Sequence, residues 1–354
     1  FKVAGSSTDN STISFTDALV INNSGASTFQ TTTDTTVATF KGFEGNNGTI
    51  EIHADEGDDN ADQWRITANT DGKLSIGNYS TGAWVNHITL DANSRFSMSN
   101  NGGEPTNTIF GYQAGNSIHG SSGMNTFFGH QVADATMTAT ADENTAVGHL
   151  ALSGLTSGAK NVAIGSYTGI NITSGDENVL IGRSAGNNHN SSDLVAVGTA
   201  ALASINNATA NGSVAVGHNA LTAITSAAES VALGYRAGLA LTTGDGNTII
   251  GYDAFKSADG AEGSNVVIGK TAGQSINHDS SAQNVIIGVG AMSGGTAQQN
   301  NNVAVGYFAL GSIANNAHTG SVAVGSNALG ALTEGTGNTA LGYQSADALT
   351  TSGY

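Results

Sequence analysis

Two stretches that lie 108 residues apart are almost identical: SVAVGHNAL at 213–221 and SVAVGSNAL at 321–329. The same pattern, a short run of mainly apolar residues before a glycine, recurs fourteen times in steps of 16 to 19 residues, and an Asn or Ser precedes the run in every copy except the one that begins at Leu194. The glycines of the fourteen copies are Gly111, Gly129, Gly148, Gly165, Gly182, Gly198, Gly217, Gly234, Gly251, Gly269, Gly288, Gly306, Gly325 and Gly342. A chain that repeats itself in this way folds as a row of similar units.

A repeat of this length restricts the fold to β structure. Each copy is rich in Val and Ile, which favour strands, and the copies are separated by turn-forming stretches such as TSGDE and TTGDG. Helical repeats need more than about thirty residues per unit. The sequence therefore predicts an all-β fold, a parallel β-solenoid of about fourteen coils, which at about 4.8 Å per coil forms a rod roughly 65 Å long.

The repeated glycine and the repeated Asn or Ser are both expected to be structural. Glycine adopts positive φ without a Cβ clash, and a stacked column leaves little room for a side chain after the strand. The Asn or Ser four residues earlier is expected to cap the preceding turn and to form a ladder from coil to coil. We assign the fourteen glycines as structural turn residues.

The apolar triplet before each glycine predicts association. Side chains alternate along a strand, so Val214 and Val216 point to one side and Ala215 to the other. One side lines the interior of the solenoid, although the sequence leaves open which one it is. The second apolar side needs another dry environment, and in a thin rod that requires another chain.

The first hundred residues do not follow the repeat. We predict a fibrous β stalk at 1–45, a small antiparallel β module with its linker at 46–105, and the solenoid at 106–354; Pro105 marks the boundary. Trp64 and Trp84 are expected in the core of the module. The chain opens without Met and ends within a repeat, so we expect it to be a piece of a longer protein.

Composition excludes several partners. The chain carries a formal charge of −17, which disfavours nucleic acid and anionic membranes, and it has no Cys. We find no apolar run of about 18 residues and expect no membrane span. We also expect no cofactor.

The N-x-V-A-I-G-x-x-A pattern resembles the head repeats of trimeric autotransporter adhesins. That resemblance implies a left-handed parallel β-roll packed as a homotrimer, although the coil here is longer than the family's and therefore carries longer loops. Residues 50–91 are similar to modules in tail-fibre proteins of marine bacteriophages, which are also homotrimers and some of which carry glycine repeats before a self-cleaving chaperone domain. The trimer number is implied by these resemblances alone.

Two groups of residues have the composition of metal sites. The first is an acidic cluster formed by Asp55, Glu56, Asp58, Asp59, Asn60 and Asp62. It lacks the spacing of a helix-loop-helix calcium loop, so we interpret it as a solvated turn. The second is formed by His130, His149 and His218, which each follow a repeat glycine; other copies carry unrelated residues there, so we expect exposed rim positions and no metal site.

Enzyme hypotheses have weaker support. One hexapeptide per coil resembles left-handed β-helix acyltransferases, but steps of 16 and 17 residues do not fit the triangular coil of that fold. An ice-binding solenoid, which is not an enzyme, would need the same Thr array in every coil, and this repeat lacks it. A polysaccharide-cleaving tailspike needs two carboxylates about 5–9.5 Å apart. Loop acids that could meet across coils or chains are Asp176, Glu177, Asp193, Asp245, Asp259 and Glu262.

The sequence thus predicts a non-enzymatic, homotrimeric viral tail-fibre segment, located in the virion tail outside the cell, that supports host attachment. Its expected partners are sister chains, other tail proteins and host-surface glycans, whereas the receptor-binding residues are not identified. The alternatives are the head of a bacterial trimeric adhesin at the cell surface and a depolymerase tailspike.

Overall fold

The computed structural model describes residues 45–53, 63–80, 82–90, 96–98, 107–187, 190–205, 210–313 and 316–351. The stalk expected at 1–45 lies outside these residues apart from Gly45. The described residues form strands and turns and contain no helix. None of them therefore belongs to a helix long and apolar enough to cross a lipid bilayer.

The first sheet is small and antiparallel, with five strands in the order β1-β2-β3-β4-β5. Its strands are β1 (Gly48–His53), β2 (Gln63–Ala68), β3 (Leu74–Ser80), β4 (Ala83–Leu90) and β5 (Phe96–Met98). A turn at Asn69–Lys73, with Gly72 at a φ of 80°, joins β2 to β3. This sheet confirms the antiparallel module that the alternating stretches predicted.

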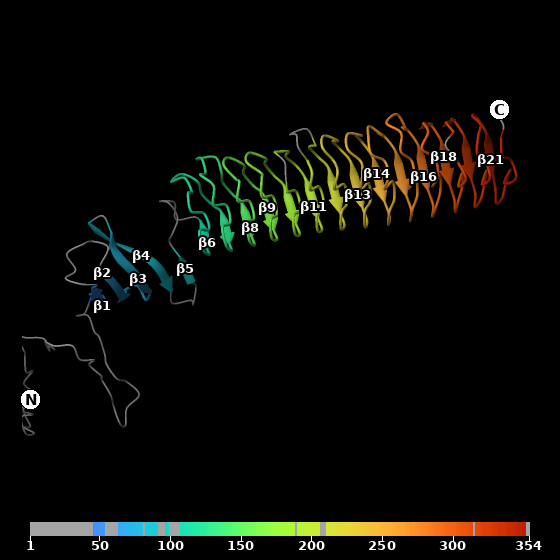
Figure 1. Cartoon of the computed structure of the whole chain (residues 1–354). Coiled ribbons are helices and arrows are strands. Elements are labelled where there is room, and N and C mark those ends of the chain that lie inside the picture. Colours follow the sequence, from blue (N-terminus) through green and yellow to red (C-terminus); the bar gives the residue numbers. More distant parts are fainter. Residues whose placement is uncertain are drawn as a thin grey trace, which may run out of the picture. The chain divides into compact units, whose positions relative to one another are not determined.

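The second sheet has fourteen parallel strands, one from each copy of the repeat, and their coils stack in sequence order (Figure 1). The first eight strands are β6 (Thr108–Phe110), β7 (Thr126–Phe128), β8 (Thr145–Val147), β9 (Val162–Ile164), β10 (Val179–Ile181), β11 (Val195–Val197), β12 (Val214–Val216) and β13 (Val231–Leu233). The other six are β14 (Thr248–Ile250), β15 (Val266–Ile268), β16 (Val285–Ile287), β18 (Val303–Val305), β20 (Val322–Val324) and β21 (Thr339–Leu341). Together they form about 13 turns of a parallel β-solenoid, which confirms the predicted fold with close to the fourteen coils expected.

Each coil buries a small set of apolar side chains inside the solenoid. In the coil of β12 these are Ala215 in the strand, Ala220 three residues after the glycine, and Leu221 and Ile224 beyond it, all fully buried. Strand residues pair in register with those of the neighbouring coil, Ala215 with Ala232 for example. The core is therefore a stack of thin apolar layers, each closed by its neighbours.

The repeat glycines follow the strands directly and have φ values between 119° and 144°. Residues with a Cβ rarely adopt this conformation. At every copy except the last, a Cβ would also collide with the carbonyl group of the glycine one coil further on, as Gly217 would with Gly234. Backbone strain and coil spacing both require glycine at this position.

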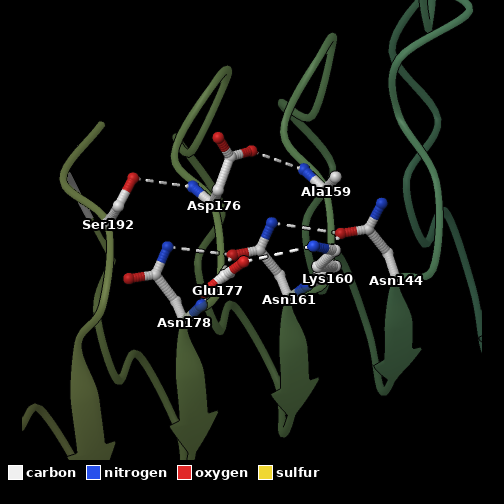
Figure 2. Close-up of polar contacts among 8 residues, drawn as sticks. All are labelled: Asn144, Ala159, Lys160, Asn161, Asp176, Glu177, Asn178 and Ser192. Carbon is white, nitrogen blue, oxygen red and sulfur yellow. Dashed lines mark hydrogen bonds and ion pairs between the residues drawn. The ribbon is translucent and has the colours of Figure 1, made fainter.

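An Asn precedes ten of the fourteen strands, and these side chains form the expected ladder, shown for three consecutive coils in Figure 2. The side-chain Nδ2 of Asn161 donates to Oδ1 of Asn144 at 3.0 Å, and Nδ2 of Asn178 donates to Oδ1 of Asn161 at 2.9 Å. Each Nδ2 also donates to a backbone carbonyl, that of Gly175 in the case of Asn161. The amides are fully buried and have hydrogen-bond partners on both sides, which confirms the ladder prediction.

A short second parallel pair, β17 (Gln299–Asn300) and β19 (His318–Thr319), lies outside the fourteen-stranded sheet. Gln299 and His318 are fully buried three residues before the ladder position. Most other coils carry Ser, Ala or Gly there.

The described residues form two compact units, one up to Val85 and one from Asn86 onward. The three-part division at residues 45 and 105 stays a prediction, because its first part lies outside the described residues.

Candidate functional site

The most extensive feature of the solenoid surface is the outer side of its large sheet. We name the first and third residues of the fourteen strands the outer sheet face. Val214 and Val216 belong to it and are only half-buried, whereas Ala215 between them is fully buried. The structure thus decides what the sequence left open: the middle residue of each triplet points inward and the flanking pair points outward.

The outer sheet face is mainly apolar: the third residue is apolar in all fourteen strands, and the first is Val in nine and Thr in five. Its strands present mainly Val, Ile, Leu, Phe and Thr to the outside. Exposed fractions reach 49% at Phe110, 53% at Phe128, 48% at Leu233 and 78% at Leu341, so these side chains lack a covering layer in the single chain. Soluble monomers rarely expose a continuous apolar stripe of this kind, and such stripes mark interaction surfaces.

The residues that follow the repeat glycines form a second column, which includes the three histidines considered above. The rings of Tyr112 and His130 stack with centroids 5.2 Å apart, and those of His130 and His149 lie 5.3 Å apart. His130 and His218 are exposed and His149 is half-buried. The prediction of exposed positions is confirmed for His130 and His218, and His218 belongs to a separate stack.

That separate stack is aromatic and charged. His218, Tyr235 and Tyr252 stack with centroid distances of 5.4 and 5.1 Å. Beside them, Arg236 donates Nε and Nη2 to the two carboxylate oxygens of Asp253, at 2.7 and 2.6 Å. This pairing raises the pKa of Arg236 above its usual value. The bidentate ion pair between Arg236 and Asp253 therefore joins the coils of β13 and β14 beside the aromatic stack.

The expectation that both tryptophans form the core of the small sheet is wrong for Trp64, which is 43% exposed. Trp84 is half-buried, meets Tyr79 edge-on at 5.4 Å and carries the Arg65 guanidinium 4.5 Å from its ring centroid. The inference from residue type failed because, among the described residues of the sheet, no second layer covers the face on which Trp64 lies.

The loop acids have different surroundings (Figure 2). Asp176 accepts a hydrogen bond from the Ala159 amide at 2.8 Å, and Glu177 pairs with Lys160 at 3.2 Å. Asp245 accepts from the Ala228 amide at 2.7 Å. These three carboxylates hold neighbouring coils together.

Asp193 is exposed, whereas Asp259 and Glu262 meet a third acid, Asp279, from the next coil. One carboxylate oxygen from each of the three lies within 4.8 Å of the other two. Burial, with Asp259 and Asp279 nearby, raises the pKa of Glu262 above its usual value. Among the described residues, this is the one group of three acids or histidines close enough to share a metal ion.

Asp279 was not singled out by the sequence analysis. Aligning the two coils by their ladder residues would have found it. Asn284 lies 19 residues after the ladder residue Asn265, and Asp279 lies 19 residues after Gly260, so Asp279 and Gly260 occupy equivalent positions in successive coils. The acidic cluster at 55–62 lies outside the described residues.

The carboxylate cluster does not suit a polysaccharide-cleaving site. A general acid has to reach the glycosidic oxygen of the substrate. Glu262 is 0% exposed, so a sugar chain cannot contact it without rearrangement of the loop.

A shallow depression of about 280 Å³ lies near the C-terminal coils. Phe308 lines it together with the polar side chains of Asn327, Gln344 and Asp347. An apolar ring beside amide and carboxylate groups is chemically suited to a sugar.

Comparison with known proteins identifies no relative: no family model, no curated protein and no solved structure matches this chain.

Proposed function

We propose that this chain is a structural, non-enzymatic segment of a homotrimeric tail fibre that supports host attachment in a virion tail. The observation that carries the proposal is the outer sheet face, which presents at least one apolar side chain on each of the fourteen strands and is uncovered in the single chain. The coils provide length and stiffness, and the variable loops face outward.

Association follows from the energetics of the outer sheet face. Removing apolar surface from water stabilises a contact by about 25 cal/mol per Å². Because the first and third residues recur at every coil, a sister chain in the same register meets equivalent apolar side chains along the whole sheet. The favourable term therefore grows with the number of coils.

The number three rests on the resemblance to trimeric adhesin heads and phage fibres. The small sheet supports association without specifying its number, since Ile52, Trp64 and Leu74 are between 43% and 55% exposed. A single antiparallel sheet with apolar residues exposed gains stability when another layer covers it.

Contact with host glycans is part of the proposal. The stack of His218, Tyr235 and Tyr252 and the depression beside Phe308 both offer rings to a saccharide. Neither surface belongs to the outer sheet face.

Light scattering coupled to size-exclusion chromatography tests the assembly. We expect a particle of three times the chain mass of 35.3 kDa. The double variant V214D/V216D places two charges on the outer sheet face and should dissociate it. The matched variant A139D/T336D adds the same charge at exposed turns and should leave the trimer intact.

A stable wild-type monomer would refute the proposal. A V214D/V216D variant that stays trimeric would show that another surface forms the contact. Far-UV circular dichroism of both variants separates dissociation from loss of folding.

The second candidate is the head of a bacterial trimeric adhesin, and the N-x-V-A-I-G-x-x-A repeat favours it equally. Antibodies raised against residues 106–354 distinguish the two: labelling of virion tails in electron micrographs supports the fibre, and labelling of the bacterial surface supports the adhesin.

A further inference from the structure

The three carboxylates of Asp259, Glu262 and Asp279 meet where two coils adjoin. Asp259 and Glu262 precede β15, and Asp279 precedes β16. Within the described part of the chain, none of the three takes part in a salt bridge. Three acids are thus held together without a protein cation to balance them.

Glu262 occupies a position that most coils reserve for a small residue. Three residues before the ladder position, ten other coils have Ser, Ala or Gly, at Ser122, Ala141, Gly158, Gly175, Ser191, Ala210, Ala227, Gly244, Ser281 and Gly335. Glu262 is nevertheless fully buried there. A carboxylate in a small buried position is a local conflict, and such conflicts concentrate at functional sites.

Gly260 brings the carboxylates of Glu262 and Asp279 together. Its amide donates to Oε2 of Glu262 at 2.8 Å. The Asp279 carboxylate occupies the space that a Cβ on Gly260 would fill. Both acids therefore converge on one residue that lacks a side chain.

The second oxygen of Glu262, Oε1, is buried and has no hydrogen-bond partner. Leaving a buried carboxylate oxygen unpaired is costly, because it loses hydration without a replacement. This observation is independent of the clustering of the three acids. It indicates that Glu262, the buried member of the three, lacks a positively charged partner.

The loops that carry the acids are fixed before any ligand binds. Oγ1 of Thr242 donates to the carbonyl of Asp259 at 2.8 Å, and the Thr243 amide donates to the carbonyl of Gly260 at 3.1 Å. In the next coil, the Ser281 amide donates to the carbonyl of His278 at 2.7 Å, closing the turn that holds Asp279. Preorganised ligands lose less entropy on binding.

We propose that Asp259, Glu262 and Asp279 bind one calcium ion that clamps two successive coils together. Calcium takes six to eight oxygen ligands at about 2.3–2.6 Å, so oxygens within 4.8 Å of one another can share one ion. Magnesium keeps most of its water and uses one or two carboxylates, so it fits three protein carboxylates less well. Asp259 and Asp279 are exposed, which gives the ion and its remaining water ligands access from solvent.

This function is additional to the proposed fibre assembly and does not depend on it. The clamp lies within one chain, and it makes the loops before β15 and β16 sensitive to calcium. The site would stiffen the solenoid only in a medium that supplies the ion.

Isothermal titration of the full chain with CaCl₂, after treatment with a chelator, tests the site. We expect one saturable site per chain, with a Kd of about 10⁻⁴–10⁻³ M, the range of extracellular modules. At 10 mM CaCl₂ the ratio of folded to unfolded protein should then rise about 10- to 100-fold. MgCl₂ should give a weaker response.

Two variants and one control make the test specific. E262S installs the residue that the next coil carries at Ser281, so it should fold, should be more stable than the wild type without calcium, and should lose the calcium response. D279N should lose that response as well. D193N removes one exposed carboxylate elsewhere and should bind calcium as the wild type does.

The proposal is overturned if the wild type shows no saturable calcium binding, or if E262S and D279N bind calcium as tightly as D193N. A magnesium response equal to the calcium response would overturn the assignment to calcium. Circular dichroism of E262S without calcium confirms that a lost response does not come from a lost fold.

Discussion

The solenoid and the small sheet use similar strands but bury them differently. In the solenoid, the middle residue of every repeat strand is buried, as Ala215 and Leu180 are. Among the described residues of the small sheet, the buried side chains are Thr67 and Ser75, whereas Ile52 and Trp64 are exposed. One region makes its own core and the other does not.

The difference comes from how each backbone closes. A solenoid coil turns back over its own strand, so Leu221 and Ile224 are buried in the same apolar core as Ala215. The five-stranded sheet is a single layer in the part that the structure describes. We infer that the stability of the solenoid depends on contacts between coils, and that the sheet depends on a layer supplied from outside it.

The largest effect should come from a repeat glycine. Gly217→Ala combines a φ of 140° with a Cβ placed against the carbonyl group of Gly234. Strain and overpacking of about 2 kcal/mol each predict a loss of about 4 kcal/mol of unfolding free energy. Urea unfolding followed by circular dichroism measures it.

Gly320→Ala is the matched control for the glycine prediction. Gly320 also has positive φ, 70°, but a Cβ there would meet nothing within 4 Å. The loss should be about 1 kcal/mol, the cost of the left-handed conformation alone. Equal losses for the two variants would disprove the role of coil spacing.

The next effect should come from the asparagine ladder. Asn161→Ala removes the acceptor of the Asn178 amide groups and the donor to Asn144 Oδ1. Buried polar groups left unpaired predict a loss of about 2–3 kcal/mol in the same urea experiment. The small sheet has no comparable ladder among its described residues.

Asn161→Ser tests whether the ladder needs an amide or only a polar atom. Ser213 and Ser230 continue the ladder naturally, and the Ser230 amide donates to Oγ of Ser213 at 3.4 Å. N161S should therefore be less destabilising than N161A. A serine variant as unstable as the alanine variant would contradict the hydrogen-bond explanation.

The repeated parts of the solenoid were predictable from the sequence for a physical reason. Gly217 and Asn161 each stand at a position where one coil contacts the next, so the same constraint returns at every copy. Strand positions, parallel pairing and the ladder all follow from that constraint, and the structure has each of them. The small sheet was predictable from alternation alone.

The remaining features were not predictable, because they depend on what lies beside a residue rather than on its type. Alternation separates Val214 from Ala215 but does not say which one faces inward. Trp64 was placed in a core on the assumption that a second layer covers the sheet. Asp279 meets Glu262 only when loops of unequal composition are aligned across coils.

A lower pH should also reduce the stability of the solenoid, because the solenoid contains the buried His318. Burial lowers the pKa of His318 below its ordinary value of 6.5, although its hydrogen bond to the Thr333 carbonyl and nearby Glu334 oppose the shift. Below pH 6.5 the unfolded chain binds a proton that the folded chain does not. Stability should therefore fall, by up to about 1.4 kcal/mol per pH unit, until the folded pKa is reached.

His318→Gln isolates this contribution, since Gln299 occupies the corresponding position one coil earlier. Thermal unfolding of both proteins between pH 7.5 and pH 4.5 should show a smaller decline for the variant. Parallel curves would mean that His318 takes up its proton equally in the folded and unfolded chains.

The smallest effect should come from the small sheet, where Trp64→Phe changes a side chain that is 43% exposed. We expect a change of less than about 1 kcal/mol, because Phe keeps an apolar aromatic ring on the face that we infer another layer covers. The variant leaves Trp84 as the sole tryptophan, so its fluorescence reports on the sheet while circular dichroism reports mainly on the solenoid.

If the two regions gain stability from different contacts, adding Gly217→Ala should move the dichroism transition to lower urea and leave the fluorescence transition in place. A common shift of both signals would mean that the sheet and the solenoid unfold as one unit.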